Sequence, residues 1–259
     1  MALSQLLLFL IFTLFILPKN YLKQPLQQTV FNAYYLRFPL LLIIGVVIIH
    51  LIEVNILDPI TSAFMNPGFT AVLTYIEYDI VAGFSSSWTP ASILFFVFIY
   101  IILYPFTLWY TPLYSIITNQ KQALQTLAFS LFFLYLIALP FYLFFPVTNV
   151  YTHYNLPSAL NTVIPQIETF FYTTTTQNNC FPSLHTAMSI IITRTIFITE
   201  NKRFQYLGVF MMVTVIISVL YLSIHWILDV IGGIIVALLA LYLSKKTINL
   251  NWMTHHESS

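Results

Sequence analysis

Seven apolar runs, each close to the length of a membrane-spanning helix, set the limits on how this chain can fold. They cover residues 2–18, 38–57, 90–113, 124–146, 182–199, 204–222 and 224–244. A helix needs roughly 20 apolar residues to cross the hydrocarbon core of a bilayer. The runs therefore predict an all-α, polytopic membrane bundle of about seven transmembrane helices.

The composition agrees with that fold class and excludes several functions. The chain is 59% hydrophobic and only 7% charged, whereas about a quarter of the residues in a soluble domain carry charge. A net charge of +1 gives no case for a nucleic-acid partner. The single cysteine, Cys180, excludes an internal disulfide and a cysteine-based metal cage. We expect one integral membrane domain over residues 1–259, surrounded by lipid, and the sequence leaves its oligomeric state open.

The first and last apolar runs need separate interpretation. The run at residues 2–18 has the length of a signal peptide, but it lacks a basic start and an Ala-x-Ala-like cleavage site, and Lys19 and Lys23 follow it. We interpret it as a retained span. The last two runs are joined by almost no connecting sequence, which predicts a tight helical hairpin near Ser223.

Charged residues predict the orientation of the bundle. With seven alternating spans, every basic residue lies on or near one face, and the opposite face carries Asp58, Glu77, Asp79 and Glu168. The positive-inside rule makes the basic loops and the C-terminal tail cytoplasmic. The runs that begin at residues 182 and 224 then begin at the extracytoplasmic face.

His225 and Asp229 are four residues apart, a spacing that places both on one face of a helix. A carboxylate bound to one ring nitrogen fixes the tautomer and raises the basicity of the other nitrogen. This is one way to make a nucleophilic histidine. A structural His–Asp pair inside the bundle explains the same spacing, so both interpretations remain open.

The segment Pro182-Ser183-Leu184-His185 is predicted to form the first turn of its helix, where proline is favoured. Free backbone N–H groups at such an end attract anions. Ordinary capping by Ser183, with His185 as an interfacial residue, is the alternative. Both histidines are expected at one membrane depth and on one side, which favours a shared site.

These motifs, with Ser218 seven residues before His225, resemble those of the type-2 phosphatidic acid phosphatase and haloperoxidase superfamily. The flanking Phe181 and Thr186-Ala187 are similar to the branch that contains the inositol phosphorylceramide synthases. The resemblance covers residues 124–244, the expected catalytic core, with the spans at 2–18, 38–57 and 90–113 as support.

The resemblance implies a metal-independent enzyme without a cofactor. It makes His225 the nucleophile that forms a phosphohistidine, oriented by Asp229, and His185 the acid that protonates the leaving oxygen. It also implies that Ser183 and Ser218 hold phosphate oxygens. No cluster in the sequence has convincing metal spacing.

The sequence departs from the family pattern where that pattern supplies positive charge. Val219 follows Ser218 in place of the usual arginine, and the basic first motif is absent around residues 145–150. The charge of a phosphate must then be met by helix N-termini, hydroxyls, a protonated histidine or a bound group, and His153 is a candidate auxiliary residue. His50 and Glu53, three apart in the second run, are interpreted mainly as a packing pair across one turn.

Three functions remain as expectations. The first is a phosphatase for a lipid phosphate or a polyisoprenyl diphosphate, acting through a phosphohistidine at the extracytoplasmic face. The second is a phosphotransferase that moves a phospho-headgroup to a lipid alcohol, as in the inositol phosphorylceramide synthases. The third is a lipid-binding or transport protein with a degenerate site, an interpretation motivated by the lost basic residues.

Overall fold

The structure, a computed structural model, describes residues 2–64 and 68–256. Helices make up its secondary structure, and the described residues contain no named strand, which confirms the predicted all-α class. The N-terminal half contains α1 (Ala2–Phe15), α2 (Lys19–Leu22), α3 (Leu26–Tyr35), α4 (Arg37–Ile52), the π-helix η1 (Glu53–Leu57), α5 (Asp58–Ser62), α6 (Gly68–Glu77), the 3₁₀ helix η2 (Ala82–Ser87), α7 (Pro90–Phe98), the π-helix η3 (Ile99–Leu103) and α8 (Tyr104–Ile117). The remainder contains α9 (Lys121–Phe144), α10 (Val150–His153), α11 (Ala159–Val163), α12 (Ile167–Phe171), α13 (Leu184–Ile198), α14 (Lys202–Tyr221) and α15 (Ile227–His256).

Several long apolar helices make this an integral membrane protein, although the count of seven spans is not confirmed. Among the described residues, five helical stretches are long and apolar enough to cross a bilayer: Arg37–Ser62, Pro90–Ile117, Lys121–Phe144, Lys202–Tyr221 and Ile227–Asn249. The runs predicted at 2–18 and 182–199 are also helical, but α1 has 14 residues and α13 has 15. At 1.5 Å per residue each falls short of a hydrocarbon core about 30 Å thick.

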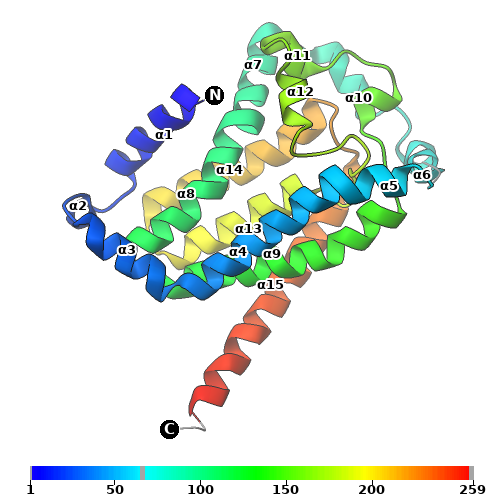
Figure 1. Cartoon of the computed structure of the whole chain (residues 1–259). Coiled ribbons are helices and arrows are strands. Elements are labelled where there is room, and N and C mark those ends of the chain that lie inside the picture. Colours follow the sequence, from blue (N-terminus) through cyan, green and yellow to red (C-terminus); the bar gives the residue numbers. More distant parts are fainter. Residues whose placement is uncertain (1, 65–67, 257–259) are drawn as a thin grey trace.

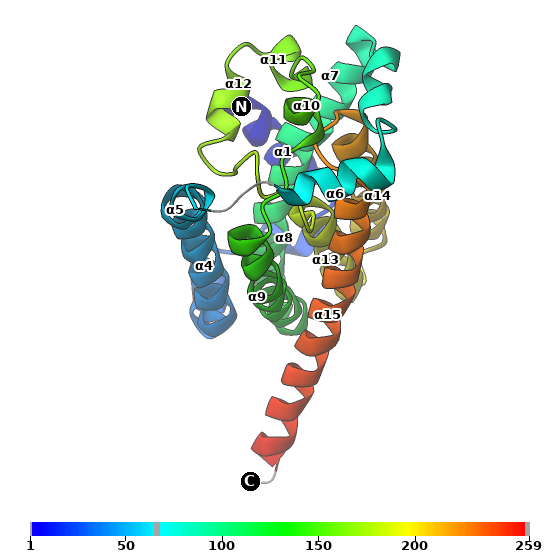
Figure 2. The same ribbon diagram turned by 90° about the vertical axis from the view of Figure 1, so that its right-hand side faces the viewer.

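Helix α9 lies between α4 and α15, and Figure 2 shows this order from the side. Helix α13 packs against α9, α14 and α15, which places it inside the bundle. The short helices α6, α10, α11 and α12 gather at the end where α15 begins, and the C-terminal part of α15 projects from the other end (Figures 1 and 2). The N-terminal ends of α13 and α15 therefore lie in the interior of the protein, near these short helices.

The hairpin predicted near Ser223 is present, and its hydrogen bonds show why it is tight. Ser223 has a φ of 56° just after α14, and its N–H donates to the carbonyl of Leu220 at 3.0 Å. The N–H of Ile224 donates to the carbonyl of Val219, also at 3.0 Å. These two bonds form a Schellman motif, which ends a helix by satisfying its last carbonyls. The chain then enters α15 after only a few residues.

Two glycines let α15 approach the start of α13 closely. A Cβ built on Gly233 would lie 2.5 Å from the carbonyl oxygen of Ser183, and one on Gly232 would lie 2.8 Å from the ring of Phe181. Real Cβ contacts do not become this short, so neither position accommodates a side chain in the present packing. The small pair therefore fixes how near the two histidine-bearing segments come.

Candidate active site

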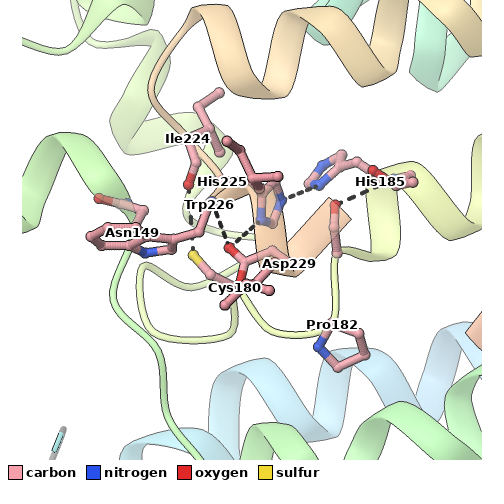
Figure 3. Close-up of polar contacts among 12 residues, drawn as sticks. Asn149, Cys180, Pro182, His185, Ile224, His225, Trp226 and Asp229 are labelled. Carbon is pink, nitrogen blue, oxygen red and sulfur yellow. Dashed lines mark hydrogen bonds and ion pairs between the residues drawn. The ribbon is translucent and has the colours of Figure 1, made fainter. Parts of the chain in front are cut away.

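His185 and His225 meet at the junction of α13 and α15. His185 belongs to the first turn of α13, and its Nδ1 lies 3.3 Å from Nε2 of His225. The ring centroids are 5.5 Å apart (Figure 3). His225 is 3% exposed, so the contact is shielded from solvent. The two imidazoles predicted to share one depth and one side are thus direct neighbours.

The structure corrects the position of His225 relative to its helix. We predicted His225 and Asp229 on one helical face, but α15 begins at Ile227 and His225 lies in the preceding turn. The carboxylate of Asp229 reaches back instead: Oδ2 accepts from Trp226 N at 2.8 Å and contacts His225 Nδ1 at 3.2 Å. An acidic side chain at the third helical position commonly reaches back in this way, because the first N–H groups of a helix lack partners.

This placement gives the two nitrogens of His225 different surroundings. Nδ1 faces a fully buried carboxylate, and Nε2 faces the ring of His185 (Figure 3). A proton shared between Nδ1 and Asp229 leaves the Nε2 lone pair available. The arrangement can therefore present Nε2 as a base or nucleophile.

Ser183 caps α13. Its side chain accepts from the N–H of Thr186 at 3.3 Å, and α13 begins at Leu184, so Pro182 precedes the cap instead of opening the helix as predicted. The physical reason is that Ser183 has extended backbone angles, which suit a cap residue. Ser183 is fully buried and is not among the residues that line the cavity described below.

Ser218 and His153 are also not among the residues that line that cavity. The hydroxyl of Ser218 is buried and donates to the carbonyl of Val215 in its own helix at 2.8 Å. Nε2 of His153 contacts the hydroxyl of Thr74 at 3.1 Å, and its ring packs on Trp226. Ser183, Ser218 and His153 are therefore not among the residues that line the cavity, and their roles in phosphate binding stay predictions.

A cavity of about 380 Å³ opens beside the two histidines. Aromatic rings surround His185 within it: the centroids of Tyr100, Tyr104 and Phe171 lie 4.7, 5.3 and 6.3 Å from the imidazole. These rings make the wall of the cavity beside His185 largely apolar. No lysine or arginine occurs among the described residues that line the cavity, in agreement with the absence of a basic clamp in the sequence.

Two residues that the sequence analysis interpreted mainly as a packing pair also line this cavity. His50 and Glu53 line it together with Tyr100 and Asn179. An ionisable residue inside an apolar span is by default a functional candidate, and this rule could have identified His50 and Glu53 from the sequence. The two hydrogen-bond partners of Glu53, Tyr135 and Asn179, nevertheless lie 82 and 126 positions away in the chain, and the sequence alone does not join them.

Glu77 occupies the N-terminus of α15. Its carboxylate accepts from the backbone N–H of Ile227 at 2.8 Å and of Leu228 at 2.6 Å. Burial raises the pKa of Glu77 above its ordinary value, although these two hydrogen bonds lower it in part. With Asp229 bound to Trp226, carboxylates occupy the N-terminal end of α15. The anion site predicted from the sequence is at the other N-terminus, that of α13.

Cys180 lies close enough to His225 and Asp229 for a metal-binding set to be considered. Their candidate ligand atoms lie within 4.8 Å of one another. Burial, followed by the charge of Asp229, raises the pKa of the Cys180 thiol well above its ordinary value. The thiol lies 3.7 Å from the carbonyl of Ile224, to which it donates a hydrogen bond.

Comparison with known protein families gives one match. A family model described as the PAP2 superfamily matches residues 75–243. The matched region includes His185, His225 and Asp229, and it leaves out α4 with His50 and Glu53. Searches of the curated proteins and of the solved structures find no match.

Proposed function

The chain belongs to the PAP2 superfamily, and from that premise we propose that it is a membrane lipid phosphate or diphosphate phosphatase acting through a phosphohistidine. Membership implies activity of the phosphatase or phosphotransferase type. The observation that carries the proposal is the line of contacts from Asp229 through both nitrogens of His225 to His185.

In the first step, Nε2 of His225 attacks phosphorus and forms an N–P bond. The bond from phosphorus to the lipid oxygen breaks, and His185 donates a proton to that oxygen. The carboxylate of Asp229 stabilises the positive charge that develops on the His225 ring. In the second step, water attacks phosphorus, His185 accepts the proton, and the N–P bond breaks.

Substrate must change the contact between the rings. In an in-line displacement the attacking nitrogen and the leaving oxygen lie on opposite sides of phosphorus. The two ring nitrogens are 3.3 Å apart, which leaves no room for a phosphoryl group between them. We therefore infer that binding separates the rings, and that the direct contact belongs to the resting enzyme.

No step in this scheme requires a metal or a cofactor, so the proposal remains a metal-independent reaction. The predicted catalytic core, residues 124–244, supplies both histidines and Asp229. The basic loops support a site at the extracytoplasmic face, with the C-terminal tail in the cytoplasm. Substrates of this class are phosphatidate-like lipids or polyisoprenyl diphosphates.

A phosphotransferase is the second candidate, and one observation favours it. The cavity continues past the histidines to hydroxyl, amide and carboxylate groups, among them Glu53 and Asn179. Such groups suit an alcohol better than they suit a hydrocarbon tail. Incubation with labelled phospholipid, with and without added lipid alcohol, separates the candidates: inorganic phosphate alone indicates hydrolysis, and a new phospholipid indicates transfer.

Trapping of the covalent intermediate tests the proposed function. Purified protein is mixed with ³²P-phosphatidate in detergent micelles and quenched in alkali, where phosphohistidine survives. We expect labelled wild-type protein, and for His225→Ala no label and a loss in turnover of about a thousandfold or more, the scale seen when a nucleophile is removed. His153→Ala is the matched control, because this histidine contacts Thr74 and Trp226 and does not line the cavity. Turnover by His225→Ala at the wild-type rate would refute the proposal.

A further inference from the structure

Helix α6 turns its apolar side chains outward and its polar side chains toward the protein. The exposed large side chains of this helix are all apolar: Phe69, Val72, Tyr75 and Ile76. The last three are each more than half exposed. The buried side chains of the helix are Thr70, Leu73 and Glu77. A helix at the surface of a soluble protein has the opposite distribution, so the outward side of α6 is not built for water.

Both ends of α6 lie beside the ends of membrane-spanning stretches. The helix begins six positions after Ser62, the last residue of the stretch 37–62. Its last residue, Glu77, contacts the first two residues of α15, which begins another such stretch. Figures 1 and 2 show α5, α6 and the start of α15 at one end of the bundle. A helix of ten residues is about 15 Å long, too short to cross the hydrocarbon core. Helix α6 therefore lies along one boundary of the membrane.

The chemistry of the outward face indicates what covers it. Residues 68–76 include no charged side chain. A lipid–water interface removes large apolar side chains from water, and tyrosine is favoured at the level of the headgroups. Amphipathic helices lie in the plane of such an interface with their apolar face among the lipids. Because the helix has no lysine or arginine, its contact does not depend on anionic headgroups.

The inward face of α6 is bonded to the start of α15. The carboxylate of Glu77 accepts from the N–H groups of Ile227 and Leu228, and Oδ2 of Asp229 accepts from that of Trp226. Carboxylates from two distant segments thus satisfy three consecutive N–H groups next to His225. Such groups are costly to leave unpaired where water is excluded. A displacement of α6 would therefore disturb the first turn of α15.

A second route joins α6 to the residue that follows His225. The hydroxyl of Thr70 accepts from the N–H of Thr148 at 3.0 Å, and the carbonyl of Thr148 accepts from the indole N–H of Trp226 at 2.9 Å. Trp226 is fully buried. Both routes from α6 end within three residues of His225, so the position of this helix and the position of the nucleophile are linked.

We propose that α6 lies in the lipid–water interface with its apolar face among the lipids, and that this contact positions the turn that carries His225. The inference rests on the proposed function and names a regulation of the same site, activation by a lipid surface. The side chains that enter the lipid touch no reacting atom. Glu77 acts as a positioning residue, because it reaches His225 only through the backbone of α15.

A spin label tests the depth of α6. A nitroxide is attached at Ile76→Cys, and the protein is reconstituted in phosphatidylcholine vesicles. Collisions of the label with oxygen, which concentrates in lipid, are compared with collisions with a water-soluble nickel complex. We expect oxygen collisions to dominate. Glu200→Cys, at an exposed position between α13 and α14, is the aqueous control, and the unsubstituted protein measures any labelling of the buried Cys180. A label at position 76 as accessible to nickel as the one at position 200 overturns the proposal.

Activity tests whether the lipid contact positions His225. The variant Val72→Asn/Ile76→Asn makes the outward face polar, and Val72→Leu/Ile76→Leu is the matched control that keeps it apolar. Phosphatidate in the same vesicles is the substrate. We expect kcat of the polar variant to fall by about tenfold, the scale of returning one apolar side chain to water, with KM nearly unchanged. The leucine variant should match wild type. Glu77→Gln should lower kcat while a label at position 76 keeps its depth.

The outcomes separate this inference from the proposed function. Wild-type kcat in the polar variant, or an equal loss in the leucine variant, overturns the proposal. If the polar variant does not fold, as judged by circular dichroism, Glu77→Gln decides, and a wild-type kcat in that variant overturns the link to His225. The depth measurement needs no turnover. An active His225→Ala protein therefore refutes the phosphohistidine mechanism without affecting the placement of α6 in the interface.

Discussion

The backbone N–H of Ser183 donates to the backbone carbonyl of Asp229 at 2.9 Å. This bond joins the cap of α13 to the first turn of α15, although the two residues are far apart in the sequence. Since His185 and His225 each lie within a few residues of it, the bond sets the distance between the two rings. The contact between His185 and His225 therefore depends on how the N-terminal ends of α13 and α15 are joined.

Replacing Asp229 with Asn should disable the nucleophile while keeping its position. Oδ2 of Asp229 contacts both Trp226 N and Nδ1 of His225, and an amide oxygen in its place keeps both hydrogen bonds but carries no charge. Because a neutral amide no longer stabilises the positive charge that develops on the His225 ring, we expect kcat to fall by about 10²–10³, with KM nearly unchanged. The steady-state rate of diacylglycerol release from phosphatidate measures kcat and KM for the variant and the wild type.

The control for this variant is Asp79→Asn, which changes an exposed acid. It should keep wild-type kinetics. A loss of less than about tenfold in Asp229→Asn would show that the negative charge of the carboxylate does not stabilise the charged His225 ring, given the energy that a charge-assisted hydrogen bond supplies.

Replacing His185 with Ala should produce a loss that depends on the leaving group. If His185 protonates the leaving oxygen, the rate should drop by about 10²–10⁴ with phosphatidate, whose alcohol leaves poorly. With an aryl phosphate, whose phenolate needs little protonation, the loss should be much smaller. Equal losses with both substrates would assign His185 a role in packing or binding instead.

The sequence predicts the helices and the shared position of the two histidines, because long apolar runs and their polar ends depend on local composition. It does not predict which helices are neighbours. The contact between Glu53 and Tyr135 requires α4 to pack beside α9, and hydropathy contains no information on that choice. For the same reason the sequence does not predict that Glu77 accepts hydrogen bonds from the first N–H groups of α15.

Helix-capping rules explain why the prediction that His225 lies within the last helix is wrong. The apolar run continues through residues 224–226, so periodicity extends the helix to His225. In the structure the Schellman motif after α14 and the reach of Asp229 to Trp226 N delay the start of α15. Backbone capping outweighs hydropathy at such an end, since uncapped N–H groups are costly where water is excluded.

Glu77 should make stability depend on pH. Because burial raises its folded pKa above the unfolded value of 4.5, the stability linked to its protonated form is full below that value and is lost as pH rises through the folded pKa. The fall in thermal midpoint between pH 4 and pH 7.5, measured in detergent by near-ultraviolet circular dichroism, should be larger in wild type than in Glu77→Gln. Glu200→Gln, an exposed control, should follow wild type, and identical pH profiles for all three proteins would contradict the prediction.

Replacing Gly233 with Ala should separate the two helix starts. The added Cβ would lie 2.5 Å from the carbonyl oxygen of Ser183, and a backbone atom cannot turn aside as a side chain can. We expect a loss of about 1–3 kcal/mol in stability, as for other overpacked positions, together with reduced diacylglycerol release because His185 moves from His225. Gly45→Ala is the matched control, since a Cβ there meets nothing within 4 Å and alanine favours a helix. A Gly233→Ala protein as stable and as active as Gly45→Ala would show that this close approach does not hold the site together.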